Sequence, residues 1–422
     1  MKDSTHPLIA LEICIFHRSP VLVAMWPLLL ALSLLPTGSI SQTCSDETRF
    51  DIETQSAIDN LAQSCEIVGS YVEIDKEFTG PFRLPNITHL NWQLVADRDD
   101  RDNPFDPPHI TTFEMPDLEY AHDIALTWLP VLEKWSVPRL LTAGHIQLEI
   151  QAHLSSLEFP ALAAVEEIII VGNVSEVEFN ELRAINGGIY IGNVDPVIVD
   201  FGGMAETFMD ISLPLLETIS GGIDIKGRAS SISLPELVSI RRSGDPEESP
   251  RPTSRFDLNG SSISLDLPKL SVVDQSIHFV GNISALSLPS LQNITDGLWI
   301  NSSSPLSIDL PLENVADVNI YGYIESIDLP NLRNWSTLSI SSELRLDCDG
   351  FITRLNETFS GDMPGWVSCS SLQTNDDTND TNNNIDADTE TDTDGARMLF
   401  ARGAGALFLA SAVIVAVGGS FF

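Results

Sequence analysis

Aromatic and basic residues are both scarce in this sequence. Phe, Trp and Tyr supply only 7% of the 422 residues, whereas 43% of the residues are hydrophobic. The chain can therefore build a large core, but mainly from small branched side chains. Lys and Arg total 22 against 60 Asp and Glu, so the formal net charge is −38. Because contacts to phosphate groups require a basic surface, this balance argues against nucleic acid as a partner.

The motifs of several common catalytic sites are also missing. The sequence has no Gly-x-Ser-x-Gly, no His-Glu-x-x-His, no phosphate-binding glycine loop and no Cys-x-x-Cys zinc spacing. Its histidines are scattered, and we interpret each as a surface or packed residue rather than a catalytic base. Those of the mature chain are His89, His109, His122, His145, His153 and His278. We therefore predict no catalytic residue, no metal site and no cofactor.

An apolar-Pro-x-apolar step recurs along most of the chain. The interval between copies is 21 residues from Pro214 to Pro235 and again from Pro268 to Pro289. The full set is Pro85, Pro116, Pro130, Pro138, Pro160, Pro214, Pro235, Pro268, Pro289 and Pro330, with a weaker copy at Pro311. Self-similarity at a fixed period of this size is the signature of a repeat protein.

Each repeat carries two short runs of alternating apolar residues, and the Leu-Pro step closes the first run. One copy places Ile211, Leu213, Leu216 and Ile219 in this pattern. Alternation with period two and β-branched residues indicate half-buried strands. A unit this short cannot bury its apolar face alone, so neighbouring copies must stack. We therefore predict an all-β fold, a parallel β-solenoid over residues 42–369 with the Leu-Pro step at a corner of each coil.

The cysteines fall in a pattern that suits a secreted protein. Cys14 lies in a segment that we expect to be removed, and the other four form one pair near each end of the predicted solenoid. These four are Cys44, Cys65, Cys348 and Cys369. Pairing by proximity joins the two cysteines at each end and closes a loop of 21 residues. We predict that both disulfides belong to caps over the open ends of the solenoid.

A short helix is predicted inside the first of these caps. Thr54 is followed by Ile58, Leu61 and Ala62, which is the spacing of an N-capped amphipathic helix. The fold prediction is therefore a β-solenoid with small disulfide-bonded helical caps.

Both ends of the chain carry apolar runs typical of processing signals. Val21–Leu35 has the length of a signal-peptide core, so we predict a signal peptide over residues 1–41. The alternatives are a buried or spanning helix, and a true start at Met25. Residues 395–422 end in an apolar tail, which predicts a glycosylphosphatidylinositol (GPI) signal that is removed on maturation. The lipid anchor is predicted to be attached at Asp394 or Gly395. A retained membrane-spanning tail is the alternative for this end.

Residues 370–394 are rich in Ser, Thr, Asn and Asp and have almost nothing to bury. We predict a disordered, self-repelling stalk here. The stretch DADTETDTDG within it resembles part of a calcium loop. However, Ala401 stands where an EF-hand loop would require its bidentate Glu, which favours a solvated spacer.

Acceptor sites for N-glycosylation are frequent. Asn-x-Ser/Thr, the sequon, occurs nine times, which predicts a glycan-coated surface for a secreted chain. The acceptors are Asn86, Asn173, Asn259, Asn282, Asn293, Asn301, Asn334, Asn356 and Asn379.

The outward positions of the two strand runs define two candidate surfaces. The first, which we call the acidic column, consists of Glu158, Glu178, Ser212, Ser233, Asp266, Ser287, Asp309 and Asp328. Stacked carboxylates could share a proton or bind calcium, but Ser interrupts the column and we expect no Arg or Lys beside it. We therefore favour a solvated face. Parallel strands about 4.8 Å apart would bring these residues side by side.

The second surface, the second-run column, consists of Tyr190, Asp224, His278, Trp299, Asn319 and Ser339. Aromatic and hydrogen-bonding side chains on one flat sheet are suited to stacking against sugars, so Tyr190, His278 and Trp299 form a candidate ligand face. An ordinary solvent-exposed surface is the alternative. Two segments rich in Pro and charge, Asp97–Pro108 and Arg241–Arg255, break the repeat and are interpreted as insertion loops.

Taken in order, these features resemble one family. The segments SDETRFDIETQSAIDNLAQS, EIVGSYVEI and CDGFITRLNETFSGDMPGWVSC, the LPxL coils and the anchored stalk are similar to the fungal GPI-anchored cell-wall organisation proteins, the extracellular-mutant and sporulation-specific group. That group is related to the receptor L-domain, a leucine-rich-repeat-like solenoid. The resemblance covers residues 43–422 and departs from the pattern at residues 97–157, where the repeats are irregular.

The resemblance implies a non-catalytic surface glycoprotein required for cell-wall organisation and integrity. Its expected location is the outer face of the plasma membrane and the wall, reached through the secretory pathway. The expected partners are the membrane, through the GPI lipid, and wall polysaccharide or wall proteins. Two alternatives remain, a carbohydrate-active β-helix enzyme and a receptor-like module that binds a ligand without transforming it.

Overall fold

The structure is a computed structural model that describes residues 42–45, 49–96, 107–127, 129–154, 156–192, 208–242, 253–359 and 363–372. The predicted signal peptide, the GPI signal with Asp394 and Gly395, and the sequon at Asn379 lie outside the described residues, as do Asp97–Asp106 and all of the stalk after Leu372. Within the described residues, no helix is both long enough and apolar enough to cross a membrane.

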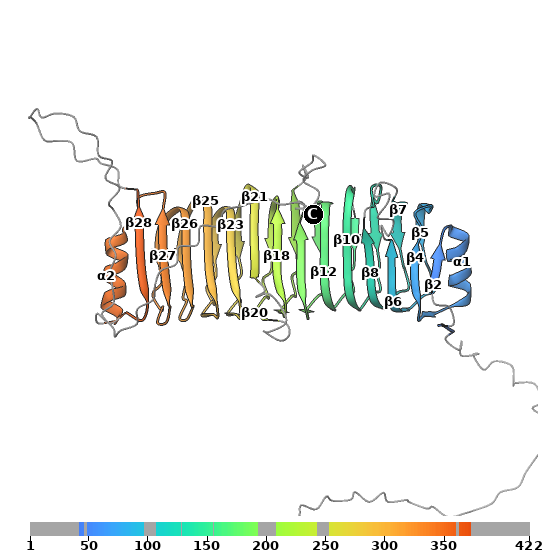
Figure 1. The fold of residues 1–422 in the computed structure, drawn as a ribbon, viewed down its shortest axis with the longest axis horizontal. Coiled ribbons are helices and arrows are strands. Elements are labelled where there is room, and N and C mark those ends of the chain that lie inside the picture. Colours follow the sequence, from blue (N-terminus) through green and yellow to red (C-terminus); the bar gives the residue numbers. More distant parts are fainter. Residues whose placement is uncertain are drawn as a thin grey trace, which may run out of the picture. The chain divides into compact units, whose positions relative to one another are not determined.

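The described chain forms a parallel β-solenoid, as the repeat pattern predicted (Figure 1). Successive coils contribute neighbouring strands to one large sheet, and each pairing between these strands is parallel. Its main strands are β2 (Arg49–Ile52), β4 (Tyr71–Ile74), β6 (His89–Ala96), β8 (Tyr120–Thr127), β10 (Thr142–Leu154), β12 (Ala164–Val174), β15 (Gly188–Gly192), β18 (Gly222–Gly227), β21 (Thr253–Asp266), β23 (Ser276–Ser287), β25 (Gly297–Asp309), β26 (Asp317–Asp328), β27 (Thr337–Ser342) and β28 (Trp366–Ser371).

Shorter strands complete the coils. Seven two-residue strands join the large sheet: β1 (Thr43–Cys44), β3 (Ile67–Val68), β14 (Ala184–Ile185), β17 (Thr218–Ile219), β20 (Ser239–Ile240), β22 (Val272–Val273) and β24 (Asn293–Ile294). One smaller sheet contains β5 (Thr79–Arg83), β7 (His109–Glu114), β9 (Lys134–Ser136) and β11 (Ser156–Glu158), and another contains β13 (Glu176–Glu178), β16 (Met209–Ser212) and β19 (Ala229–Ser233). In later coils, long strands such as β21 and β25 contain both predicted runs without a break.

The Leu-Pro-x-Leu phrase forms a tight turn at one corner of the coil. The backbone N–H of Leu216 donates to the carbonyl of Leu213 at 3.3 Å, and Leu237 repeats this bond to Leu234. Proline suits the second position of such a turn because its φ is already fixed. The two leucines of each turn are fully buried. Pro130 differs, because it lies in another bend between β8 and β9 while Pro138 occupies the corner of that coil.

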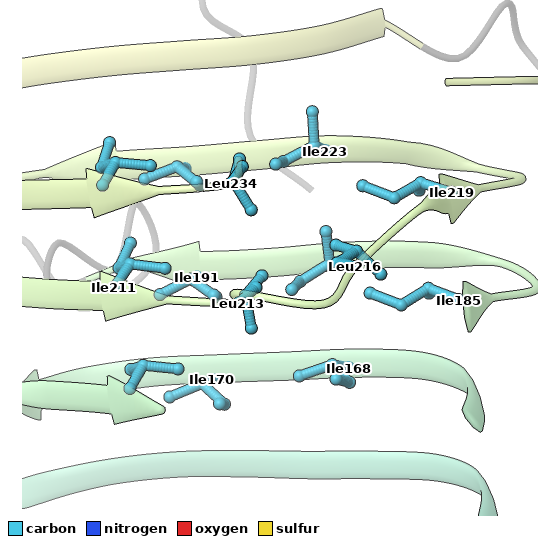
Figure 2. Close-up of a cluster of buried hydrophobic side chains, with 14 of the residues drawn as sticks. Ile168, Ile170, Ile185, Ile191, Ile211, Leu213, Leu216, Ile219, Ile223 and Leu234 are labelled. Atoms are coloured by element: carbon cyan, nitrogen blue, oxygen red, sulfur yellow. The ribbon is translucent and has the colours of Figure 1, made fainter. Parts of the chain in front are cut away.

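The core consists of columns of similar side chains from successive coils (Figure 2). Ile211, Leu213 and Leu216 point inwards from one coil, as the alternating pattern predicted, and each is 0% exposed. Complete burial of a Leu or Ile side chain contributes about 1.5–3 kcal/mol relative to exposure. Repetition of these columns along the solenoid therefore supplies the main driving force for stacking.

Residues 97–157, where the repeat pattern is irregular, still form coils in their described parts. Aromatic side chains replace the usual Leu and Ile at inward positions. Phe82 and Phe113 stack with ring centroids 4.6 Å apart, and Trp135 meets Phe159 edge to face at 4.9 Å. The strands β5, β7, β9 and β11 all pair in parallel, with one register shift between Gly80 and Phe82. The irregular repeats therefore keep the solenoid architecture but differ in the type of core residue and contain local register shifts.

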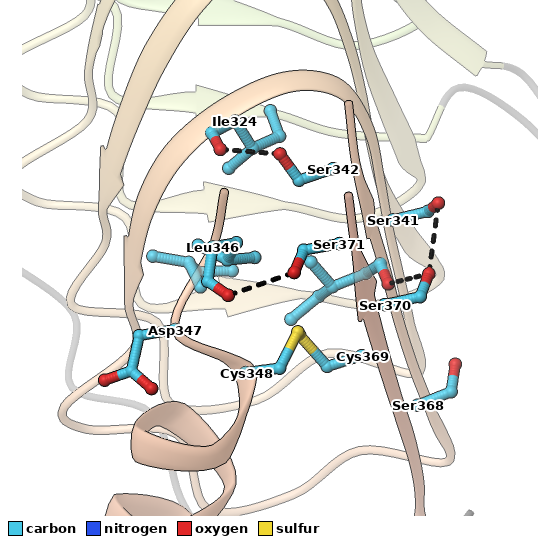
Figure 3. The surroundings of a disulfide bond; sticks show 12 residues. Ile324, Ser341, Ser342, Leu346, Asp347, Cys348, Ser368, Cys369, Ser370 and Ser371 are labelled. Carbon is cyan, nitrogen blue, oxygen red and sulfur yellow. Dashed lines mark hydrogen bonds between the residues drawn. A yellow bond between two sulfur atoms is a disulfide. The ribbon is translucent and has the colours of Figure 1, made fainter. Parts of the chain in front are cut away.

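Both predicted disulfides are present, each beside a short helix. Cys44 is bonded to Cys65 around α1 (Gln55–Ser64), and Cys348, the first residue of α2 (Cys348–Phe359), is bonded to Cys369 (Figure 3). The predicted capped helix is confirmed, because the side chain of Thr54 accepts a hydrogen bond from the backbone of residue 57. Its predicted apolar positions are buried.

Two predicted boundaries need correction. Strand β28 extends to Ser371, so the last coil continues two residues past the predicted start of the stalk at Ser370. Ser371 donates a hydrogen bond to the carbonyl of Leu346 at 3.2 Å, which ties the strand to the segment before α2 (Figure 3). The second predicted insertion loop ends earlier than expected, because residues 253–255 already belong to β21.

Candidate functional site

The outer face of the large sheet carries the second-run column in the predicted order. Tyr190 lies opposite Asp224, and His278 lies opposite Trp299, which in turn faces Asn319. The second-run column also contains one residue that the sequence interpretation missed. Arg255 of β21 stands between Asp224 and His278 in the register. It was missed because Arg241–Arg255 was interpreted as an insertion loop.

Tyr190 is held against its own sheet. A Cβ built on Gly192 would lie 3.5 Å from two atoms of the tyrosine side chain, so the ring covers this glycine. The ammonium group of Lys226 lies 5.1 Å from the ring centroid and 2.6 Å from the carboxylate of Asp224. These contacts make Tyr190 a packed surface residue, and its aromatic face already contacts the ammonium group of Lys226.

The middle of the column is polar and internally paired. Arg255 forms an ion pair with Asp257 at 3.0 Å. Burial lowers the pKa of His278, and the nearby positive charge of Arg255 lowers it further. The imidazole is therefore kept neutral near neutral pH, and it packs against Trp299 with ring centroids 5.4 Å apart.

Trp299 is the exposed member of the predicted ligand face. Its residue exposure is 39%, whereas Tyr190 and His278 are only partly exposed. A Cβ built on Gly297 would lie 3.1 Å from Nε1 of the indole, so the glycine makes room for the ring. Of the three predicted ligand-face residues, the structure brings His278 and Trp299 into contact and places Tyr190 three coils away from His278 in the register.

A second polar group lies on β6, β8 and β10, and the sequence interpretation missed it. We call it the histidine cluster: Gln93, His122, Asp123 and His145. Nδ1 of His145 lies 2.7 Å from Oδ1 of Asp123, and Nδ1 of His122 lies 3.1 Å from the same oxygen. The amide of Gln93 donates to the other carboxylate oxygen at 2.8 Å. Two histidines that look scattered in the sequence therefore meet at one carboxylate.

A local break in strand alternation creates this arrangement. The inward residues Ala121 and Ile124 are separated by two residues, His122 and Asp123, instead of one. The ladder from β6 to β8 shifts register at the same level, between Leu90 and Gln93. An interpretation based on strict period two could not place these side chains together, since consecutive residues would be assigned to opposite faces.

Charge and burial compete within the cluster. Burial favours a raised pKa for Asp123, but hydrogen bonds from Gln93 and His145 and the charge of His122 outweigh it and lower the pKa. Burial also acts to lower the pKa of His145, but its hydrogen bond to Asp123 and the nearby carboxylates of Glu167 and Glu166 raise the pKa overall. The pair is thus poised as a carboxylate beside an imidazole that binds a proton readily.

An exposed tryptophan borders the histidine cluster. Trp92 is 54% exposed and stacks on the ring of His122, with centroids 6.1 Å apart. An imidazole oriented by a carboxylate can bind a hydroxyl group or move a proton, and an exposed indole can pack against a sugar ring. This combination forms a candidate carbohydrate-binding surface. No group of three or more His, Cys, Asp or Glu residues in the described ranges is arranged to hold a metal ion.

The acidic column follows the predicted order but is not uniformly acidic. Asp309 and Asp328 are direct neighbours, whereas Asp266 faces Ser287. The expectation that no Arg or Lys lies beside the column is wrong at Glu158, because Lys134 is 3.3 Å away. The remaining described neighbours pair Glu178 with Ser212, and Ser212 with Ser233.

Glu158 differs from the other carboxylates of the acidic column. A hydrogen bond from Ser136 at 2.6 Å is the main cause of its lowered pKa, and Ser156 and Lys134 contribute in the same direction against burial. Such a carboxylate stays ionised and is stabilised by its neighbours. It is therefore suited to a structural role.

The sequons differ in how their asparagine side chains are used. Asn334 donates to Asn314, which in turn donates to Asn293, so two acceptors belong to a ladder of amides. The amide of Asn282 donates to a backbone carbonyl at 2.8 Å, and that of Asn86 does so at 3.4 Å. The side-chain amides of Asn301 and Asn356 make no hydrogen bond to any described residue. The side chain of Asn259 lies outside the described residues.

No protein-family model, curated protein or solved structure matches this chain. The function must therefore be inferred from the fold, the disulfides and the surface side chains. The class defined by these features is a disulfide-capped β-solenoid.

Proposed function

We propose that the chain is a non-catalytic, GPI-anchored surface glycoprotein that contributes to the organisation and integrity of a fungal cell wall. The observation that carries the proposal is the pair of disulfides, one beside each helix at Cys44–Cys65 and Cys348–Cys369. Disulfides of this kind persist in secreted and surface proteins because the cytosol keeps thiols reduced. The sequons are consistent with the same route.

The proposed location is the outer face of the plasma membrane, with transfer to the wall as a further step. Residues 395–422 have the composition of a GPI signal, and residues 370–394 that of a spacer. The solenoid would then be presented to wall polysaccharide or wall proteins. The histidine cluster with Trp92 is the surface that we assign to a polysaccharide ligand, because it combines an exposed indole with fixed hydrogen-bonding groups.

The anchoring part of this proposal is tested by truncation. A chain ending at Leu372 keeps all of β28 and should fold, become glycosylated and escape to the medium. It should fail to restore resistance to wall stress in cells that lack the gene, whereas the full chain should restore it. Phosphatidylinositol-specific phospholipase C should release the full-length protein from intact cells. Full rescue by the truncated chain would make attachment incidental.

A carbohydrate-active enzyme is the second candidate, and the Asp123–His145 pair is the observation that favours it. A carboxylate that orients an imidazole is a common arrangement for proton transfer. Incubation of the purified solenoid with β-glucan, chitin and mannan distinguishes the two functions. Binding without release of shorter products supports the non-catalytic function. Product release that disappears in His145→Gln supports the enzyme.

A further inference from the structure

One predicted glycan acceptor lies directly beside the most exposed residue of the predicted ligand face. Asn301 follows Trp299 by two positions in β25, and the residues on either side of Asn301, Ile300 and Ser302, are buried. Because alternate residues of a strand share a face, Trp299 and Asn301 both project from the outer surface. A glycan on Asn301 and an external ligand on Trp299 would therefore compete for the same space.

The neighbouring strands surround Asn301 with uncharged side chains. Asn301 lies opposite Val280 of β23 on one side and opposite Tyr321 of β26 on the other. Neighbouring parallel strands are about 4.8 Å apart, so both side chains lie within reach of the first sugar of a glycan. His278 and Asn319 flank Trp299 at the next level.

The two aromatic rings are held in place without the glycan. The hydroxyl of Tyr321 donates to the amide oxygen of Asn319 at 3.1 Å, so the ring lies back along its strand, beside the Trp299–Asn301 segment. The pyrrole edge of Trp299 lies over Gly297, where no Cβ opposes it. His278 of the neighbouring strand β23 also packs against the indole. Fixed rings lose little conformational freedom when a sugar packs on them.

The electrostatic character of this surface suits a neutral sugar. None of the residues around Asn301 carries a formal charge, since His278 has a lowered pKa. The nearest charged group along the second-run column, Arg255, is paired with Asp257. N-acetylglucosamine, which forms the first unit of an N-linked glycan, offers C–H groups to aromatic faces and hydroxyl groups to Asn319.

We propose that Trp299 and Tyr321 form a cradle for the chain's own N-glycan, attached at Asn301, and not a site for an external ligand. The innermost N-acetylglucosamine packs on the two rings and covers the exposed indole. This inference rests on the proposed function, because N-glycosylation requires entry into the secretory pathway. It also leaves the histidine cluster as the outer-face surface for external carbohydrate, since β6, β8 and β10 contain no sequon.

The amide of Asn301 is available for modification. It makes no hydrogen bond to a described residue, unlike the amides of Asn282 and Asn334. Asn356 in α2 shares this property, and the aromatic residue that neighbours it on the helix, Phe359, is already packed edge to face against Trp335. Asn356 therefore serves as a matched control, being an acceptor without a cradle.

The test combines glycopeptide mapping with a double-mutant cycle on the full chain secreted from a eukaryotic host. Mapping should find a glycan on Asn301. Asn301→Gln should lower the Tm by about 1–3 °C when Trp299 is present. The same change should have a smaller effect in a Trp299→Leu background, because one of the two rings of the cradle is already absent. Asn356→Gln should give equal shifts in both backgrounds.

A second measurement avoids any effect of the substitutions on folding. Folded wild-type protein is treated with an endoglycosidase that leaves one N-acetylglucosamine on each asparagine. The Tm should be retained, since the cradle holds the first sugar.

Additive effects of Asn301→Gln and Trp299→Leu would overturn the cradle. An unmodified Asn301 in a protein glycosylated at Asn356 or Asn86 would also overturn it, while leaving the proposed surface glycoprotein intact. The absence of glycans on all sequons in the native host would instead contradict the proposed function.

Discussion

The imidazole of His145 is hydrogen-bonded to the carboxylate of Asp123 across neighbouring coils, with 2.7 Å between Nδ1 and Oδ1. Gln93, one coil earlier, binds the other oxygen of the same carboxylate. A buried polar group that is fully hydrogen-bonded fixes the positions of the elements it joins. The histidine cluster therefore ties together β6, β8 and β10 at their outer face while leaving the imidazole partly exposed.

The first prediction concerns the pH dependence of this pair. Asp123 has a lowered pKa in the folded state, so its contribution to stability is present above its unfolded pKa of about 3.9 and is lost as the pH falls through the folded value. His145 has a raised pKa, so its contribution is present below about 6.5 and is lost as the pH rises through the folded value. Both contributions coexist between these limits.

Urea unfolding of wild type and His145→Gln at several pH values checks this prediction. The difference in the free energy of unfolding should be largest near pH 5 to 6 and should shrink towards pH 8, at which His145 loses its proton. His278→Gln is the matched control, because the lowered pKa of His278 gives the opposite trend. Protonation of His278 at low pH disfavours the folded state, so His278→Gln should lower the free energy of unfolding less at low pH than at high pH. A difference for His145→Gln that does not vary with pH would contradict the assigned ion pair.

The second prediction concerns the acidic column. Asp309 and Asp328 face each other on adjacent strands, so replacing both by Asn should leave the stability unchanged or raise it by about 0.2–1 kcal/mol through relief of like-charge repulsion. Adding Asp266→Asn should have little further effect, since Asp266 faces Ser287. Glu158→Gln should lower the stability, because it weakens the contacts to Ser136 and Lys134.

Urea denaturation of these variants provides the measurement. Wall-stress resistance in cells should be unchanged for the Asp266, Asp309 and Asp328 triple variant. Loss of a polysaccharide-cleaving activity in that variant would identify the column as a reaction centre and not a solvated face.

The third prediction separates the two disulfides. Each closes a loop of 21 residues, so removal of either pair by Cys→Ser substitution should cost about 3 kcal/mol in the chain-entropy model. Coils of a solenoid contact mainly their neighbours, so the loss should be local. Removal of Cys348–Cys369 should increase amide exchange in β27, β28 and α2 but not in β2 and β4. Equal increases at both ends would show that the solenoid unfolds as a single unit.

The repeat and the caps could be predicted from the sequence because the residues that specify each of them lie close together in the chain. Leu213, Pro214 and Leu216 together specify a turn and two buried positions within four residues. The disulfide loops and the helix after Thr54 are local in the same sense. Period two, the spacing of proline and the cysteine count therefore predicted the fold without information about contacts distant in sequence.

The candidate site could not be predicted in the same way. His122 and His145 meet at Asp123 because two residues, His122 and Asp123, separate the inward residues Ala121 and Ile124. Period two allows only one residue between inward positions and assigns consecutive residues to opposite faces. Arg255 was assigned to a loop because the sequence does not show where a long insertion ends and the strand resumes. Both errors have one origin, a local departure from the average repeat.

The last prediction concerns two glycines at bends of the long strands. Gly281 and Gly322 have φ values of 114° and 92°, and a Cβ at either position would lie 2.0 Å or 2.1 Å from a carbonyl oxygen of the preceding coil. Only glycine permits both the positive φ and this close approach between coils. Gly80 also has a positive φ, 94°, but a Cβ there would meet no atom within 4 Å.

Alanine substitution at these positions separates backbone strain from coil spacing. Gly80→Ala should cost about 1–2 kcal/mol, the cost of the left-handed conformation alone. Gly322→Ala should cost about 1–3 kcal/mol more, because the methyl group must push the coil of β26 away from the carbonyl of Ser302. Urea denaturation gives the total cost, and amide exchange should show the extra loss in β25 and β26. Equal costs at Gly80 and Gly322 would mean that the coils separate without penalty, and close stacking at this bend would then contribute nothing to the stability of the solenoid.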